Sequence, residues 1–250
     1  MGGIVQRIVG ALTGAKARAE AEKPHFQRDY ERHVRNLKES HPLDEAMSLA
    51  VGGHYDIQGR IHLELLRSLG LKDGDSLIDL GCGSGRTARQ LAESGSYGYL
   101  GIDVVKDLID YARAHTPADY RFHISTNLKI PAEDASADIV YSFSLFTHLL
   151  HEETYLYMEE VSRVLRPGGT FLFSFLEFGN RGHFPVFLGS VEQQRNGTKP
   201  VMNMFIERNV IELWAEKLGF AVEKYVEGYR EIVPDGRLGQ TGAVLRRLER

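Results

Sequence analysis

The chain has 250 residues, of which 42% are apolar and 26% charged, and its formal net charge is −4. At roughly 150 residues per domain this length provides one large or two small globular domains, and the composition excludes a disordered, collagenous or repeat-only chain. The chain lacks the basic excess that binds phosphate backbones, so nucleic acid is not an expected partner.

Residues 1–45 are predicted to form an N-terminal helical extension or lid made of two helices. The segment is highly charged, and apolar residues recur in it at helical spacing. These are Ile4, Val5, Ile8, Val9 and Leu12. We expect the extension to dock on its own domain, while contact of this amphipathic segment with a membrane surface or a partner stays open but is not required.

Residues 46–250 are predicted to form one domain in which apolar runs of strand length alternate with helical patterns. Strands are expected at residues 76–80, 98–102, 120–124, 137–143 and 169–175, and helices at 86–94, 105–115 and 155–165. An irregular, aromatic-rich insertion at 176–207 precedes a helix at 207–218 and a hairpin of residues 221–229 and 242–248. The alternation predicts an α/β fold with a seven-stranded, doubly wound, mostly parallel sheet, helices on both faces and an antiparallel terminal hairpin.

A glycine-rich turn joins the first expected strand to the next helix. Residues 78–86 read IDLGCGSGR, which places Gly81, Gly83 and Gly85 in G-x-G-x-G spacing. Glycine is needed where the backbone adopts positive φ or approaches a ligand closely, and the helix start offers free N–H groups. Arg86 stands where the dinucleotide fingerprint has its third glycine, which disfavours a nicotinamide-dependent oxidoreductase.

Asp103 ends the second expected strand, beside the glycine turn in the same strand–helix–strand unit. Ligands of open α/β sheets bind at the carboxyl ends of the strands. A carboxylate there can accept hydrogen bonds from both hydroxyls of an adenosine ribose, so we expect Asp103 to contribute to an adenosine site.

These residues resemble the class I S-adenosylmethionine-dependent methyltransferases over roughly residues 50–248. The matching segments are 79–85 (first motif), Asp103 (the ribose-binding acid), 138–143 (fourth strand) and 165–169 (the turn before the fifth strand). The resemblance implies S-adenosyl-L-methionine as cofactor and S-adenosyl-L-homocysteine as product. It also implies that Asp79 faces the amino group of the cofactor, that the glycine backbone lies against its amino-acid and ribose parts, and that residues 176–207 lie on the acceptor side.

Four further residues complete the expected cofactor site. Asn127 follows the third strand, where the family often has an Asp, and its side-chain oxygen can accept the adenine N–H. A cation at a helix N-terminus opposes the helix dipole by a few tenths to about 1 kcal/mol, so Arg86 is expected to pair with Asp79 or with the cofactor carboxylate, extension into solvent being the alternative. Ser144 follows the fourth strand, and Tyr55 lies in a loop that closes over the cofactor in related enzymes.

The candidate catalytic residues follow the fourth and fifth strands. Methyl transfer to an alcohol requires a base, and His148, just past the fourth strand, has a side chain that titrates near neutrality. Its alternative role is capping or packing the next helix. His151 is the reserve candidate, and Glu177 after the fifth strand is expected either to bind a hydroxyl or to be a capping or surface residue. No metal is expected, because no carboxylate ends the fourth strand to bind magnesium.

Residues 144–149 and 173–178 look like those of stand-alone bacterial methyltransferases of polysaccharide, glycolipid or secondary-metabolite assembly. The expected function is therefore O-methylation of a hydroxyl of a sugar, glycoconjugate or secondary metabolite, with a small molecule or glycan as acceptor. The lack of an Asn-Pro-Pro-Tyr type motif disfavours exocyclic amines. Two alternatives stay open: C- or N-methylation of a small metabolite or lipid, and a cofactor-binding protein without catalysis.

The single cysteine, Cys82, allows no disulfide within the chain. The absence of C-x-x-C pairs argues against zinc and iron–sulfur sites, and this cysteine usage is typical of a reducing compartment. No apolar run approaches the roughly 20 residues that cross a bilayer. We therefore expect a cytoplasmic protein, of which the sequence leaves the oligomeric state open.

Overall fold

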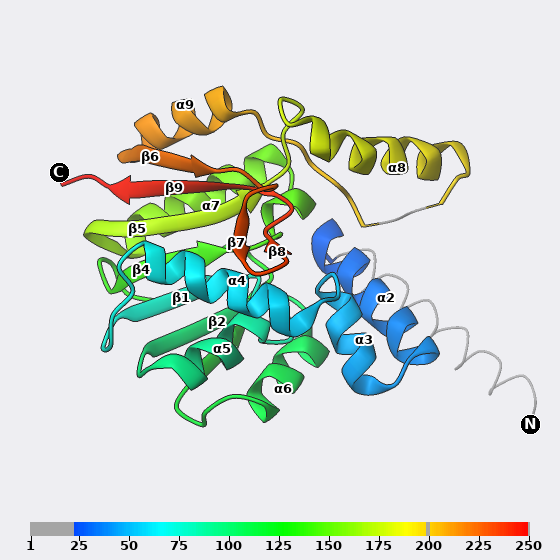
Figure 1. Ribbon diagram of the computed structural model, residues 1–250, viewed down its shortest axis with the longest axis horizontal. Coiled ribbons are helices and arrows are strands. Elements are labelled where there is room, and N and C mark those ends of the chain that lie inside the picture. The colour runs from blue at the N-terminus through cyan, green and yellow to red at the C-terminus, as the bar shows by residue number, and fades with distance from the viewer. Residues whose placement is uncertain (1–22, 199–200, 250) are drawn as a thin grey trace, which may run out of the picture.

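The computed structural model describes residues 23–198 and 201–249 of the chain, so the apolar pattern expected between residues 4 and 12 lies outside the described residues. Its centre is a seven-stranded sheet in the order β3-β2-β1-β4-β5-β9-β6 (Figure 1). The strands are Ser76–Leu80 (β1), Gly98–Asp103 (β2), Arg121–Ile124 (β3), Ala137–Ser142 (β4), Leu165–Phe175 (β5), Phe220–Val226 (β6) and Thr241–Arg247 (β9). Strands β1 to β5 pair in parallel, and β9 runs antiparallel to β5 and β6. The predicted sheet is thus confirmed.

Helices cover both faces of this sheet because successive strand residues point to opposite sides. The helices span Tyr55–Ser68 (α4), Arg86–Ser94 (α5), Lys106–Ala114 (α6), His151–Val164 (α7) and Arg208–Leu218 (α9). Leu77 and Tyr141 belong to the apolar cluster shared with α4, α5 and α6, whereas Ile78 and Val140 belong to the cluster shared with α7 and α9. The two clusters are the core of a doubly wound α/β domain.

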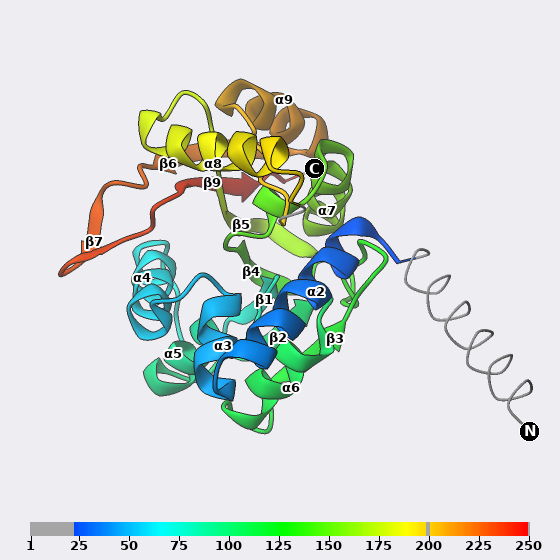
Figure 2. The same cartoon turned by 90° about the vertical axis from the view of Figure 1, so that its right-hand side faces the viewer.

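Two N-terminal helices, His25–Ser40 (α2) and Leu43–Ala50 (α3), lie across the carboxyl ends of β1 and β2, and we call this pair the cover (Figure 2). Val34 and Met47 of the cover pack with Leu108 of α6 in a third apolar cluster. A hydrogen bond joins α2 to α7 through His25 and Glu153 (2.8 Å), and an ion pair joins it to α6 through Lys38 and Asp107 (2.7 Å). The cover is therefore fastened to the domain near both ends of α2.

The structure departs from the expected elements mainly in residues 176–207, which are not irregular throughout. They contain a short 3₁₀ turn, Arg181–His183 (η2), and a helix, Phe184–Arg195 (α8). The apolar residues of α8 follow one another in Phe184–Leu188 instead of recurring at helical spacing, and none is buried, so periodicity gave no helix signal. A small ribbon of Glu231–Val233 (β7) and Gly236–Arg237 (β8) was also not expected. Among the described residues, no helix has the length and apolar character to cross a membrane.

Candidate active site

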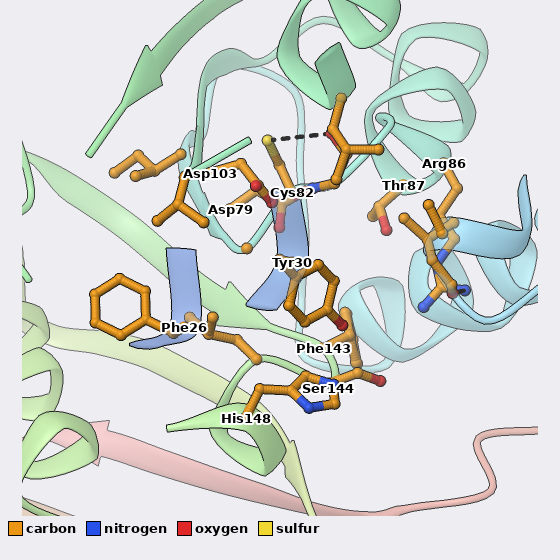
Figure 3. A pocket seen from close by; sticks show the side chains of 18 of the residues that line it. Phe26, Tyr30, Asp79, Cys82, Arg86, Thr87, Asp103, Phe143, Ser144 and His148 are labelled. Carbon is orange, nitrogen blue, oxygen red and sulfur yellow. Dashed lines mark hydrogen bonds between the residues drawn. The ribbon is translucent and has the colours of Figure 1, made fainter. Parts of the chain in front are cut away.

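A cavity enclosing about 850 Å³, part of it open to solvent, lies between the cover and the carboxyl ends of β1, β2 and β4 (Figure 3). The parallel register aligns Asp79 of β1 with Gly101 of β2 and with Tyr141 of β4, so residues that follow these strands meet at one edge of the sheet. The lining includes the glycine turn, both strand-end carboxylates and side chains from the cover. This is the edge at which open α/β sheets bind ligands.

The glycine turn forms the floor of the cavity in a conformation that side chains would obstruct. Gly81 and Gly83 have φ of 72° and 56°, in the left-handed region that favours glycine. A Cβ on Gly83 would lie 2.5 Å from Val51 Cγ1 of the turn after α3, and one on Gly81 would lie 3.0 Å from Leu145 Cβ. The turn thus leaves exposed backbone that a ligand can approach closely.

Asp103 stands at the end of β2 with its carboxylate fixed by two backbone donors. Gly83 N–H donates to one oxygen (3.0 Å) and Val105 N–H to the other (2.9 Å). Burial raises the pKa of Asp103 above its ordinary value, and these backbone hydrogen bonds act in the opposite direction. Each carboxylate oxygen retains a second lone pair for a ligand hydroxyl.

Asp79 is 4% exposed, and Tyr99 donates its hydroxyl proton to it at 2.9 Å. Burial raises the pKa of Asp79 to about 7, while the Tyr99 hydrogen bond and the charge of Arg86 lower it. Arg86 makes no ion pair with Asp79; its Nη1 donates to the Val51 carbonyl oxygen at 2.6 Å. Burial lowers the pKa of Arg86 to about 10. The guanidinium remains a cation in the lining of the cavity, and it holds the turn after α3.

His148 ends a 3₁₀ turn, Phe146–His148 (η1), and lines the cavity. Its Nδ1 lies 2.6 Å from the Met202 carbonyl oxygen. A carbonyl can only accept, so the ring proton is on Nδ1 and Nε2 is the basic nitrogen. Burial lowers the pKa of His148 below its ordinary value, and His33 lowers it further. The hydrogen bond to Met202 acts in the opposite direction but does not offset this decrease.

Ser144 precedes this turn with φ of 64°, a left-handed conformation that is costly for a residue with a side chain. Ser174 Oγ accepts from its N–H at 2.8 Å, and its own carbonyl accepts from the Thr147 hydroxyl at 2.8 Å. Strain of this kind persists where surrounding contacts hold it, and it is frequent at functional sites. Here it turns the chain from β4 so that Leu145 and His148 reach the cavity.

Tyr30 of the cover points into the cavity between Asp103 and His148 (Figure 3). Its ring meets that of His148 edge to face, with centroids 5.1 Å apart. Burial raises the pKa of the Tyr30 hydroxyl, and Asp103 adds to this increase. Phe26, one turn earlier in α2, also lines the cavity.

The structure brings together Asp79, Gly81, Gly83, Arg86, Asp103, Ser144 and His148 of the expected site residues. Gly85 lies behind the turn against Ala112, and the Tyr55 hydroxyl donates to the Ser84 carbonyl at 2.7 Å. Both support the turn without lining the cavity.

Three expected residues have other partners outside the cavity lining. The exposed Asn127 uses its side-chain oxygen to accept from the Ser125 hydroxyl (3.1 Å) and from a backbone N–H in its own turn. The exposed His151 lies 3.0 Å from the Phe205 carbonyl oxygen. Glu177 is buried in a two-bond ion pair with Arg208 (2.8 and 2.9 Å). Burial alone would raise the pKa of Glu177, but Arg208 and Thr241 hold it below its ordinary value, so the carboxyl is not prepared to act as an acid.

Several lining residues were not predicted from the sequence, among them His62 of α4 and Thr87 of α5. His62 Nδ1 lies 2.7 Å from Thr87 Oγ1, and the ring stacks on Phe143 after β4 with centroids 3.6 Å apart. No sequence signal joins these residues, because they come from three separate elements.

The chain was compared with known proteins. Residues 78–173 match the model of a family described as "Methyltransferase domain". Two similar curated proteins are an O-methyltransferase of Pyrenophora dematioidea and the 27-O-demethylrifamycin SV methyltransferase of Amycolatopsis mediterranei, each 31% identical over 44% of this chain. The chain spans 42% of the length of each of these relatives.

Solved structures give the same result for the fold. The magnesium protoporphyrin IX methyltransferase of Synechocystis, solved with bound S-adenosylhomocysteine, superposes with a TM-score of 0.58 at 14% identity. The superposition covers 86% of this chain and 93% of that one. The family match over residues 78–173, the sheet order and the glycine turn agree: this chain is similar to S-adenosylmethionine-dependent methyltransferases over the part that holds β1 to β5, and it has their fold.

Proposed function

We propose that this protein binds S-adenosyl-L-methionine in the cavity beneath the cover and methylates a hydroxyl group, with His148 as general base. The lining suits each polar part of that cofactor. Asp79 suits its ammonium, Arg86 its carboxylate and Asp103 its ribose hydroxyls. Next to Asp103 the lining is apolar, with Val104 and Leu108, which suits the flat adenine ring.

The observation that carries the proposal is the orientation of His148. Its Nδ1–H is held by the Met202 carbonyl, which leaves the lone pair of Nε2 as the proton acceptor. Its lowered pKa keeps the ring neutral at pH 7, which is the form that a base requires. Met202 belongs to the insertion 176–207, so this segment positions the base.

When bound, the cofactor supplies a methyl group on a positively charged sulfur, which makes transfer an in-line displacement. The residues of the chain then have two tasks, to hold the acceptor oxygen in line and to remove its proton. Nε2 of His148 takes the proton as the oxygen–carbon bond forms. The Tyr30 side chain, beside His148 in the cavity, positions the acceptor oxygen and excludes water.

The acceptor class is inferred from the curated relatives, several of which are named as O-methyltransferases. One of them is named for its substrate, as 27-O-demethylrifamycin SV methyltransferase. For this chain we propose the broader class of hydroxylated small molecules. Sugars, glycoconjugates and secondary metabolites are the first acceptors to screen.

The test compares His148→Ala with His151→Ala, a matched histidine three residues away that lies outside the cavity lining. Turnover is measured as S-adenosylhomocysteine release with a panel of hydroxylated acceptors, and cofactor affinity by calorimetry. We expect His148→Ala to lose about 100-fold or more in kcat, the usual contribution of a general base, and to bind S-adenosylhomocysteine as the wild type does. His151→Ala should retain wild-type turnover.

Unchanged turnover in His148→Ala would remove this residue from the mechanism. Transfer to amines or carbon acids that does not depend on His148 would replace O-methylation by N- or C-methylation. Cofactor binding without transfer to any acceptor class would favour a binding protein.

A further inference from the structure

The 3₁₀ turn that carries His148 (η1) is held from two sides. The insertion holds its end: the Met202 carbonyl oxygen lies 2.6 Å from Nδ1 of His148. Met204 N–H also donates to the Thr147 carbonyl at 2.7 Å. On its other side the turn follows Ser144, whose left-handed backbone (φ 64°) needs contacts that maintain it. The groups that hold Ser144 therefore also determine where His148 lies.

Ser144 is connected to Gln240, which directly precedes β9, by a chain of two hydrogen bonds. Oγ of Ser174, next to the end of β5, accepts from Ser144 N–H at 2.8 Å and donates to Oε1 of Gln240 at 2.7 Å. A serine hydroxyl has one proton and rotates to suit its partners, so the acceptor of that proton sets where its lone pairs point. Among the described residues, Gln240 is that acceptor, and Ser174 is only 1% exposed. Gln240 therefore turns a lone pair of Ser174 toward the Ser144 backbone.

The ribbon of β7 and β8 holds Gln240 in place. Leu238, two residues earlier, is buried in the same apolar cluster as Ile61 of α4. At the base of the ribbon, Gly239 N–H donates to the Gly228 carbonyl at 2.9 Å. A Cβ on Gly228 would lie 2.6 Å from the Gln240 carbonyl oxygen, so the two backbones are in close contact. The position of Gln240 is thus fixed by packing on the domain and not by Ser174 alone.

We propose that Gln240 is a positioning residue for the base: through Ser174 it holds Ser144 in the conformation that directs His148 into the cavity. This inference rests on the proposed function. Gln240 lies outside the cavity lining, so its effect on transfer is indirect. Displacing a reacting group by about 1 Å can cost about 100-fold in rate. Loss of the hydrogen-bond chain therefore lowers kcat and leaves cofactor affinity in place.

The test breaks the chain at two points and restores it at one. Gln240→Met removes the acceptor and keeps an unbranched side chain, whereas Gln240→Glu keeps an oxygen that accepts from Ser174. Ser174→Ala removes the middle of the chain. The matched control is Ser162→Ala, because this buried serine of α7 also donates one hydrogen bond, to the Leu218 carbonyl at 2.8 Å.

Turnover is measured as S-adenosylhomocysteine release with the hydroxylated acceptor that the wild type methylates fastest, and S-adenosylhomocysteine affinity by calorimetry. We expect Gln240→Met and Ser174→Ala to lose about tenfold in kcat, less than a full displacement of the base would cost. Both should bind S-adenosylhomocysteine within about twofold of the wild type, the usual error of additivity. Gln240→Glu should recover most of the turnover, and Ser162→Ala should retain it.

The decisive comparison repeats both substitutions in a His148→Ala background. A residue that acts only through the base has nothing left to position there, so Gln240→Met and Ser174→Ala should not lower the residual turnover further. Ser174→Ala in particular tests the buried step of the chain. If it does not fold, Gln240→Met makes the same comparison at a side chain that is only half buried.

An equal loss in both backgrounds would overturn the inference, because it would show that the chain supports the fold and not the base. Unchanged kcat in Gln240→Met and Ser174→Ala, or a parallel loss of cofactor affinity, would overturn it as well. Full turnover in His148→Ala alone would refute the proposed base, an outcome distinct from failure of the positioning role.

Discussion

The pKa of Asp79 is the residue property with the most direct functional consequence. With a value of about 7, raised by burial, the carboxyl is about half protonated at neutral pH. A cofactor ammonium beside it would favour the ionised form, because an opposite charge lowers the pKa of an acid. Cofactor binding would then release a proton from Asp79 at pH values near or below 7.

We therefore expect the affinity for S-adenosylhomocysteine to be nearly constant above pH 7 and to fall as the pH decreases below it, by up to about tenfold per unit. The affinity falls toward low pH because a protonated, neutral carboxyl binds an ammonium more weakly than a carboxylate does. Calorimetry from pH 5.5 to 8.5 measures this dependence. Asp79→Asn should bind weakly with a flat profile, and a flat profile in the wild type would contradict the proposed contact.

Residue chemistry was only partly predictable from the sequence. Asp79, Asp103 and the glycines were predicted because they lie within one short strand–helix–strand unit, so chain order already brings them together. Asn127 was expected in the adenine site, but its own turn satisfies its side-chain oxygen. His62 was not predicted, because its partners Thr87 and Phe143 are distant in sequence.

At the scale of elements, the ion pair between Glu177 and Arg208 joins the end of β5 to the start of α9. Glu177 is 3% exposed, and it also accepts from the Thr241 hydroxyl at 2.6 Å. Removing one partner of a buried pair leaves an unpaired charge, which costs more than the pair contributes. The pair is thus structural, at the base of the insertion that carries Met202.

Arg208→Met should lower the free energy of unfolding by about 3 kcal/mol. This is the low end of the cost of breaking a buried ion pair, because Arg208 itself is 35% exposed. The control is Arg195→Met, whose exposed partner Glu192 lies at 3.2 Å, and it should cost less than about 1 kcal/mol. Urea unfolding at pH 7 measures both. Equal losses in the two variants would contradict the structural role of Glu177.

Element boundaries were predictable where apolar periodicity was strong. The first strand and the helix after the glycine turn have the predicted bounds, 76–80 and 86–94. In contrast, α8 was missed because none of its side chains is buried and its apolar residues follow no helical period. Periodicity reports on burial, and a helix that buries no side chain leaves no such signal.

At the scale of the whole molecule, the sheet and its two apolar clusters form a fixed platform, and the cover closes the ligand side. From its composition the sequence predicts a separate N-terminal extension of residues 1–45, whereas the second helix of the cover runs on to Ala50. The sequence could not predict how the cover is held, because the contacts of Lys38 and His25 join α2 to α6 and α7, far along the chain.

The two fastenings of α2 have a kinetic consequence. Phe26 and Tyr30 line the cavity, so movement of α2 would widen the path by which a bound ligand leaves, and the contacts of Lys38 and His25 oppose that movement. Interactions between exposed charges weaken as salt shortens the screening length. We expect S-adenosylhomocysteine to dissociate severalfold faster from Lys38→Met than from the wild type, and from the wild type faster at high salt.

Stopped-flow displacement measures these rates, and Lys217→Met is the control, because this exposed lysine pairs with Glu216 within α9. Equal dissociation rates in all three proteins would show that α2 does not limit exchange. If the expected order is found, product residence time is set by surface ion pairs outside the reaction centre. Turnover would then respond to ionic strength even though the chemical step does not.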